Sequence, residues 1–197
     1  DIIRLKKMEE MVEVHYNSGQ FSCTLKLLEK EFSHPSSMFL ALADYYEEKR
    51  LFGFSHNRLA RYEIMYDFLK EKFEEEELSK FRDALMLDLY LRENLKSRPS
   101  FASDQSDAKY EIREFFAAEA ENPRWLRGYE GYDSRQLIKM AHMEHLEDGS
   151  YMLFDYKNRD PLNKNAKAVR FIYEENGKEY PVYCLNKDLH GVGDYIA

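Results

Sequence analysis

One short segment of the sequence carries residue types that bind metal ions: His142, Glu144 and His145 lie within four positions. Zinc or iron needs three or four converging ligands of this kind. In a β-strand, His142 and Glu144 share a face while His145 points to the opposite one, whereas in a helix the two histidines would be neighbours. No spaced partner pair is apparent elsewhere in the sequence. A small metal-dependent enzyme using these three residues is therefore one hypothesis, and a polar strand face is the favoured alternative.

A second segment with chemical potential is the mixed-charge run 155–161, DYKNRDP. Asp and Asn side chains in such a run bond to nearby backbone N–H groups, and Pro161 fixes the backbone, so a turn is expected. The charged side chains of a surface turn are also available for contacts with another domain or an anionic ligand. The candidates for such surface or rim contacts are Asp155, Lys157, Arg159 and Asp160.

A single carboxylate, Asp88, interrupts the most apolar run of the chain, Ala84–Leu91. We expect it on the narrow solvated edge of a helix, or paired with Arg92 four residues later. A buried catalytic aspartate is the sharper and less favoured interpretation.

Self-contained catalytic motifs are missing. Gly191-Val192-Gly193 lacks the third glycine and the downstream acid of a dinucleotide-binding fingerprint. No GxSxG, HExxH or P-loop pattern occurs. The two cysteines, Cys23 and Cys184, lie far apart and form no CxxC pair. Neither a disulfide framework nor a cysteine-ligated cluster is predicted, and reduced thiols in a cytoplasmic protein are expected. We assign no catalytic, cofactor-binding or metal residue within this chain.

Composition and charge argue against several classes of protein. The 29 basic and 37 acidic residues give a formal charge of −8, which disfavours nucleic acid or an anionic membrane as the main partner. A content of 44% hydrophobic and 15% aromatic residues supplies a core and argues against disorder. No segment reaches the roughly 18 apolar residues that a membrane span needs.

The secondary-structure elements that must position these residues are predicted to differ between the first and second halves of the chain. Up to residue 98, apolar residues recur every three or four positions, which indicates helices. The fourth helix is predicted to begin at Ser55 as N-cap. The fifth is predicted to end at Arg98, because the residue before Pro99 is pushed out of helical geometry. Short loops between such helices favour antiparallel neighbours, so residues 1–98 are predicted to form a helical bundle.

The second half of the chain has a mixed pattern. Residues 99–106 are a polar connecting loop, and one more helix is predicted over 106–122, ended by Pro123. Aromatic and β-branched residues at 151–156 and 168–173 predict strands, and Asn176-Gly177 predicts a hairpin. Residues 107–197 are therefore expected to form a small antiparallel sheet with one or two packed helices. The predicted fold class is α+β.

Four segments together resemble a known family. They are RLKKMEEMVEVHYNSGQF (4–21), RLARYEIMYDFLKEKF (58–73), DLYLRENLKSRPSF (88–101) and YMLFDYKNRDPLNKNAK (151–167). The most specific part is FDYKNRDP, which lies within the last segment. They resemble the C-terminal region of cobalamin-binding radical SAM proteins, also called Fe–S oxidoreductases. Some members are named magnesium-protoporphyrin monomethyl ester oxidative cyclase-like. The resemblance spans nearly the whole chain, with the segments in the same order.

The resemblance implies a parent protein in which cobalamin-binding and radical SAM domains precede this chain. There a CxxxCxxC motif holds a [4Fe–4S] cluster that cleaves S-adenosylmethionine reductively. Cys23 and Cys184 cannot supply three cluster cysteines, so no family catalytic residue is carried over. The implied role is a non-catalytic C-terminal accessory domain that covers or shapes the active site or recruits a partner. The alternative is a free-standing helical interaction module. Because Asp1 begins abruptly inside a helical pattern, we expect the chain to be part of a longer protein.

Overall fold

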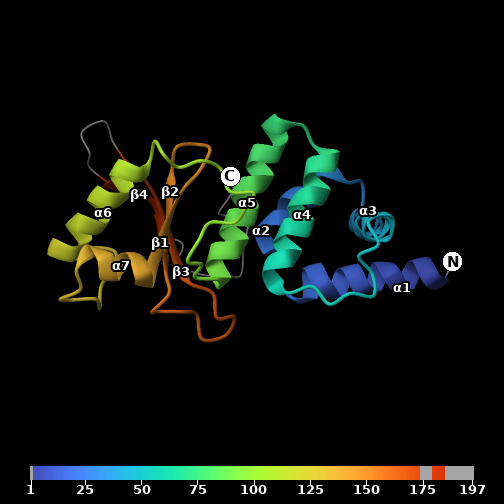
Figure 1. The fold of residues 1–197 in the computed structure, drawn as a ribbon, viewed down its shortest axis with the longest axis horizontal. Coiled ribbons are helices and arrows are strands. Elements are labelled where there is room, and N and C mark those ends of the chain that lie inside the picture. Colours follow the sequence, from blue (N-terminus) through green and yellow to red (C-terminus); the bar gives the residue numbers. More distant parts are fainter. Residues whose placement is uncertain (1, 174–178, 185–197) are drawn as a thin grey trace. The chain divides into compact units, whose positions relative to one another are not determined.

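The chain folds into two compact units, and each is described by itself. The computed structural model describes residues 2–173 and 179–184 (Figure 1). The first unit contains the described residues up to Leu89, and the second contains those from Tyr90 onward. The first is helical and the second combines helices with a sheet, which confirms the α+β fold class. The hairpin turn predicted at Asn176-Gly177 lies outside the described residues.

The first unit is built from helices at the predicted places. They are α1 (Ile2–Met11), α2 (Ser22–Leu28), α3 (Pro35–Glu48), α4 (Arg58–Lys72) and the greater part of α5 (Glu75–Arg92). A π-helical turn, Val12–Asn17, continues α1, and a 3₁₀ turn, Glu29–Glu31, continues α2. A π-helical turn is rare and costs regular hydrogen-bond geometry, so it marks a local departure from the α pattern.

Local chemistry explains where two of these helices begin. Pro35 occupies the first turn of α3, where its missing N–H would have had no helical partner anyway. The helix α4 begins after Asn57, whose side chain accepts a hydrogen bond from the N–H of Ala60 at 2.8 Å. The predicted cap at Ser55 is therefore wrong. Asparagine is an equally good N-cap residue, and Asn57 lies next to the first helical residue.

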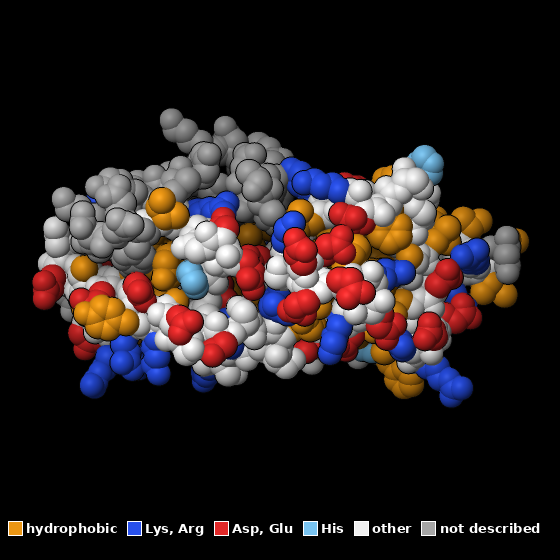
Figure 2. All heavy atoms as spheres, turned by 90° about the horizontal axis from the view of Figure 1, so that it is seen from above, with side chains coloured by type: hydrophobic (Ala, Val, Ile, Leu, Met, Phe, Trp, Pro, Cys, Tyr) orange, Lys and Arg blue, Asp and Glu red, His pale blue; other side chains and the backbone are white. Residues whose placement is uncertain are grey.

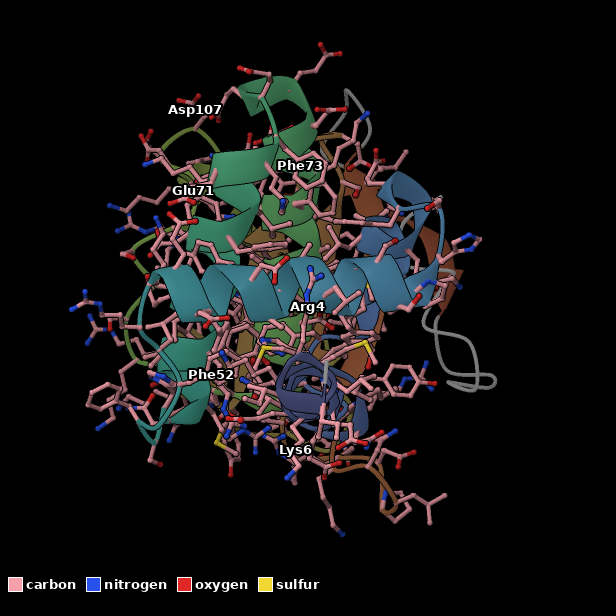
Figure 3. The ribbon with its side chains drawn as sticks, turned by 90° about the vertical axis from the view of Figure 1, so that its right-hand side faces the viewer. Arg4, Lys6, Phe52, Glu71, Phe73 and Asp107 are labelled. Carbon is pink, nitrogen blue, oxygen red and sulfur yellow. The ribbon has the colours of Figure 1, made fainter. Side chains whose placement is uncertain are left out.

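Helix α1 packs against α3, which crosses the view of Figure 3 while α1 is seen nearly end-on. Two ion pairs join the exposed sides of these helices, Arg4 with Asp44 at 2.9 Å and Lys7 with Glu47 at 2.6 Å. Exposed pairs of this kind contribute about 0–1 kcal/mol each. The packing of α1 therefore depends chiefly on apolar side chains such as Met11, which is fully buried.

The helix α5 is apolar on every side over its second half. Every residue from Ala84 to Leu91 is buried, so this helix presents more than one apolar face. Its predicted end at Arg98 is wrong, because α5 ends at Arg92. The cause is a set of hydrogen bonds to its last carbonyl groups, which the next subsection describes.

The second unit is organised on a four-stranded antiparallel sheet with the order β1-β2-β3-β4. Its strands are β1 (Ala141–His145), β2 (Tyr151–Asp155), β3 (Lys167–Tyr173) and β4 (Glu179–Cys184). The register places Leu153 of β2 opposite Met143 of β1 and Val169 of β3. These three apolar side chains therefore share one face of the sheet.

Two helices, α6 (Lys109–Glu121) and α7 (Ser134–Met140), belong to the same unit (Figure 1). Asp133 begins α7 with a capping box, in which it and Gln136 bond to each other's backbone N–H groups. The core that these helices form with the sheet consists of Ala108, Phe115, Phe116, Leu126, Tyr129, Leu137, Ala141, Met143, Tyr151, Leu153, Val169 and Phe171. Tyr110 of α6 lies outside this core and is 70% exposed.

Candidate functional site

The alternation of side chains along β1 decides how its ionisable residues are placed. His142 and Glu144 share one face of the strand, while the ring of His145 lies on the other face, 4.7 Å from the ring of Tyr151. The three side chains of the histidine-rich segment therefore do not converge. Among the described residues, no group of three or more His, Cys, Asp or Glu side chains could hold a metal ion.

Glu144 is the centre of a buried ionic cluster. Its side chain is 1% exposed, and each carboxylate oxygen accepts a hydrogen bond from the Arg98 guanidinium, at 2.6 and 2.7 Å. The Nε2 atom of His142 lies 2.8 Å from one of the same oxygens. Bidentate, charge-assisted bonds of this kind offset the cost of removing a carboxylate from water. We call Arg98, Glu144 and His142 the ionic cluster.

The ring of His142 is fixed by stacking as well as by its hydrogen bond. It stacks on Tyr90 with ring centroids 3.5 Å apart and planes 14° apart, and its side chain is 20% exposed. Burial, together with the nearby negative charge of Glu144, raises the pKa of the Tyr90 phenol. A carboxylate that orients an imidazole is an arrangement used in proton transfer. Here Arg98 already compensates the charge of Glu144, which favours a structural role for the cluster.

The charged turn 155–161 begins with a side chain that is buried. Asp155 is 4% exposed and accepts hydrogen bonds from the Tyr129 hydroxyl, the N–H of Lys157 and the Asn158 side chain. The expectation that Asp155 lies at the surface or rim is therefore wrong. Inside the turn, the Asp155 carboxylate is the hydrogen-bond acceptor for the Tyr129 phenol and for the backbone N–H that follows the strand.

The three other charged residues of this turn are more exposed and also have partners. Asp160 accepts bonds from two backbone N–H groups, two and three residues later, at 2.8 Å each. The Lys157 ammonium lies 4.7 Å from the ring centroid of Tyr129 and also donates to the carbonyl of Gly128. The predicted turn with Asx-type bonds is confirmed. Whether these side chains contact another domain or a ligand stays a prediction.

Arg159 and its neighbours end α5. The guanidinium of Arg159 donates to the carbonyl of Arg92 at 3.1 Å, and the Tyr156 hydroxyl donates to the carbonyls of Tyr90 and Glu93, at 2.9 and 3.1 Å. The N–H of Ala166 donates to the carbonyl of Leu91 at 2.6 Å. The last carbonyls of a helix need partners from outside it. The loop between β2 and β3 supplies them, so α5 ends before the position that Pro99 suggested.

Asp88 is a structural residue that the sequence did not place correctly. It is fully buried in the first unit and accepts bonds from the N–H groups of Cys23 and Thr24 and from the Thr24 hydroxyl, each at 2.8 Å. Because the first N–H groups of a helix have no helical partner, Asp88 acts as the cap of α2. The signal available was a lone acid within eight consecutive buried positions of α5, a place where a charge requires partners.

Glu119 has the same role in the second unit and was not singled out from the sequence. It is 2% exposed and accepts bonds from the backbone N–H groups of Arg124, Trp125 and Leu126, at 2.8 to 3.1 Å. This side chain therefore holds the loop that follows α6. Tyr129, in the same loop, is buried in the core of this unit.

His15 is a fully buried histidine of the first unit. Its Nδ1 lies 3.1 Å from the carbonyl of Met11, which can only accept, so Nδ1 carries the proton. The Nε2 atom is then the acceptor that faces the Tyr46 hydroxyl at 3.4 Å. Burial lowers the pKa of His15 to about 4. The ring is therefore neutral at neutral pH.

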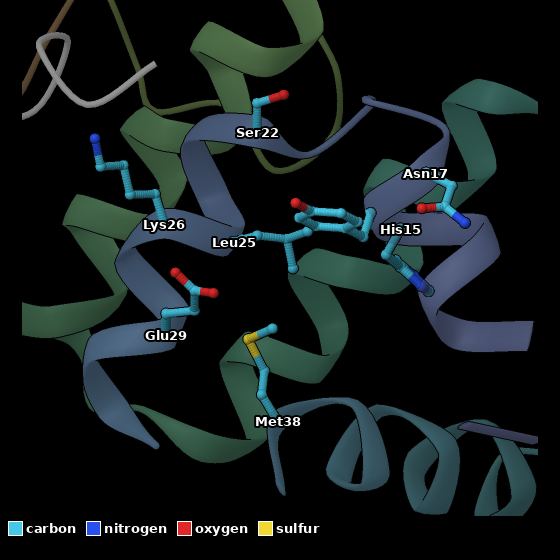
Figure 4. Close-up of a pocket in the computed structure, with 8 residues that line it drawn as sticks. His15, Asn17, Ser22, Leu25, Lys26, Glu29 and Met38 are labelled. Atoms are coloured by element: carbon cyan, nitrogen blue, oxygen red, sulfur yellow. The ribbon is translucent and has the colours of Figure 1, made fainter. Parts of the chain in front are cut away.

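A cavity of about 600 Å³ lies beside His15 in the first unit (Figure 4). The π-helical turn, α2 and Met38 of α3 line it. Lys26 and Glu29 contribute opposite charges to the wall, so the wall favours neither an anionic nor a cationic ligand. The Ser22 hydroxyl in its lining donates to the carbonyl of Gly19 at 3.1 Å rather than to a base, so no activated nucleophile defines a reaction here.

Comparison with known proteins assigns the family. A family model described as "Protein of unknown function (DUF4080)" matches residues 1–171. The chain belongs to this family. No curated protein and no solved structure matches the chain. Within the described residues, no helix is both long and apolar enough to cross a membrane.

Proposed function

We propose that this chain is a non-catalytic C-terminal accessory domain of a cobalamin-binding radical SAM Fe–S oxidoreductase. In this role it covers or shapes the active site or recruits a partner. The proposal comes from the resemblance of the four segments given above, of which FDYKNRDP is the most specific. Its partners are the radical SAM and cobalamin-binding domains of the same polypeptide. The cytoplasmic location stays a prediction.

The hydrogen bonds of the buried carboxylates support the proposal that this chain is non-catalytic. Four carboxylates are buried among the described residues, and each is engaged in holding the fold: Asp88, Glu119, Glu144 and Asp155. Three of them accept bonds from backbone N–H groups, and Glu144 binds Arg98 and His142. A general acid or base must instead reach a substrate proton. A scaffold that supports a neighbouring active site fits this use better than an active site of its own.

The cofactors of the proposed parent do not fit this chain. A [4Fe–4S] cluster is held by cysteine thiolates, and the radical SAM motif supplies three. The sequence has two cysteines, and Cys23 is buried at the start of α2. We therefore assign the cluster, S-adenosylmethionine and cobalamin to other domains of the parent and derive no step through them.

The first test is the reading frame of the gene. A CxxxCxxC motif encoded upstream of Asp1 in the same frame supports the proposal, and a start codon immediately before Asp1 contradicts it. The second test uses the full-length protein and a variant that lacks this chain, both loaded with iron, sulfide and cobalamin and supplied with S-adenosylmethionine and dithionite as the reductant. We expect the shortened protein to keep its cluster and to cleave S-adenosylmethionine, measured as 5′-deoxyadenosine. Loss of the cluster in a folded shortened protein would show that the chain supplies ligands.

A further inference from the structure

Three of the seven residues that line one pocket of the second unit are cationic. It has a volume of about 380 Å³, and its wall includes Arg98, Lys109 and Arg113 with one carboxylate, Asp104. Over most of the described part of the face in Figure 2, by contrast, acidic and basic side chains are interspersed. Because Arg98 is paired with Glu144, the excess positive charge of this wall comes from Lys109 and Arg113, in a chain whose formal charge is −8.

Arg98 is held in place before any ligand arrives. Its guanidinium donates two bonds to Glu144 and one to the carbonyl of Ser103 at 3.1 Å. A guanidinium has five N–H donors in a rigid fork, so donors remain for a ligand in the pocket. Because the geometry is already fixed, a bound anion would not have to order this side chain.

Lys109 and Arg113 stand four positions apart on α6, so their side chains are neighbours on one helix face. Both are exposed, and neither forms an ion pair with another residue of the part that the structure describes. Like charges at this spacing repel each other and destabilise a helix. An anion between them would relieve that repulsion while gaining two charge-assisted contacts.

The remaining wall defines the rest of the ligand. Asp104 accepts bonds from the N–H and the hydroxyl of Ser106, at 3.0 and 2.9 Å, so its oxygens are partly occupied within the loop. Ile112 adds an apolar surface to the wall. A small molecule with an oxyanion at one end and an apolar body at the other matches such a wall.

We infer that this pocket binds the phosphate or carboxylate group of a small organic anion through Arg98, Lys109 and Arg113. The apolar part of the ligand contacts Ile112. The inference goes beyond the proposed function and does not depend on it, because it needs no other domain.

The test is a titration of the ¹⁵N-labelled 197-residue chain followed by its amide resonances. The probes are phenyl phosphate and benzoate, with benzyl alcohol as the neutral control. We expect saturable shifts at Ser106, Lys109 and Ile112 with at least one anion, and none with the alcohol. The anion that binds more tightly identifies the chemistry as phosphate or carboxylate. No saturable shift with either anion, or an equal response to the alcohol, overturns the inference.

A matched pair of double variants separates the site from general charge. Lys109→Ala/Arg113→Ala should weaken binding by about tenfold or more, because two charge-assisted contacts are lost. Arg135→Ala/Lys139→Ala removes the same charge from exposed positions with the same spacing on α7 and should leave binding unchanged. Equal weakening by both pairs overturns the inference. Lys109→Gln/Arg113→Gln repeats the test with helix-compatible side chains, in case the alanine pair folds poorly.

Discussion

Asp88 of the first unit and Glu144 of the second are buried carboxylates that are held in different ways. In the first, Asp88 receives backbone N–H groups and a hydroxyl at the start of α2. In the second, Glu144 receives the guanidinium of Arg98 and the ring of His142. Backbone donors are fixed by the helix that carries them, whereas side-chain donors can move, become hydrated or change partners. The first unit therefore has a rigid anchor, and the second has an ionic cluster that can be rearranged or replaced.

The largest effect is expected where the rigid anchor is removed. Asp88→Ala leaves the buried N–H groups of Cys23 and Thr24 without their acceptor, which should cost about 4 kcal/mol of unfolding free energy. Urea denaturation of the chain measures this loss. Asp67→Ala, at an exposed position of α4, is the control and should change stability by no more than about 0.5 kcal/mol. A loss below about 1 kcal/mol for Asp88→Ala would mean that water or another group replaces the carboxylate.

The next effect is a pH dependence that comes from the first unit. The pKa of His15 is about 4 in the folded chain against 6.5 for the free side chain. The unfolded state therefore binds more protons between these values, and stability falls as pH decreases from about 7 to 4. The shift corresponds to about 3 kcal/mol. Chemical denaturation at several pH values should show a flatter dependence for His15→Gln, and an unchanged one for His34→Asn, an exposed position.

Breaking the ionic cluster should have a smaller effect, because Arg98 is 30% exposed and can be rehydrated. Glu144→Gln should cost about 2 kcal/mol, and Glu121→Gln at an exposed position should cost almost nothing. The comparison becomes sharper with Arg98→Met/Glu144→Leu, which replaces the pair with apolar side chains. We expect this double variant to regain part of the loss. If the double variant is less stable than Glu144→Gln, apolar side chains cannot replace the cluster, which would then be as hard to replace as the anchor at Asp88.

The smallest effects concern the turn of the second unit. Arg159→Ala loses bonds to the carbonyls of Arg92 and Lys164, and should cost about 1 kcal/mol. Lys157→Ala loses an exposed cation–π contact with Tyr129, and should cost about 0.5 kcal/mol. Thermal melting of the two variants ranks them. The reverse order would mean that Arg159 contributes little to the end of α5.

The same contrast explains what the sequence could predict. Helical periodicity predicted the helices of the first unit, and the strand alternative for residues 142–145 placed His142 and Glu144 on one face. These patterns depend on near neighbours in the chain. The partners of Asp88 lie 64 and 65 residues away, and Arg98 reaches Glu144 across 46 residues. Periodicity assigns a residue to a face and cannot tell which donor meets it there, so these contacts were not predicted.

The early end of α5 has a consequence for the order in which the chain folds. The groups that bind its last carbonyls come from Tyr156 and Arg159, across 63 to 67 residues of chain. Helical turns form in well under a millisecond, whereas contacts between distant segments must first overcome the entropy of closing a long loop. The body of α5 can therefore form early from local interactions. Its final turn becomes complete only when the connection between β2 and β3 arrives, which makes that turn a late step in folding.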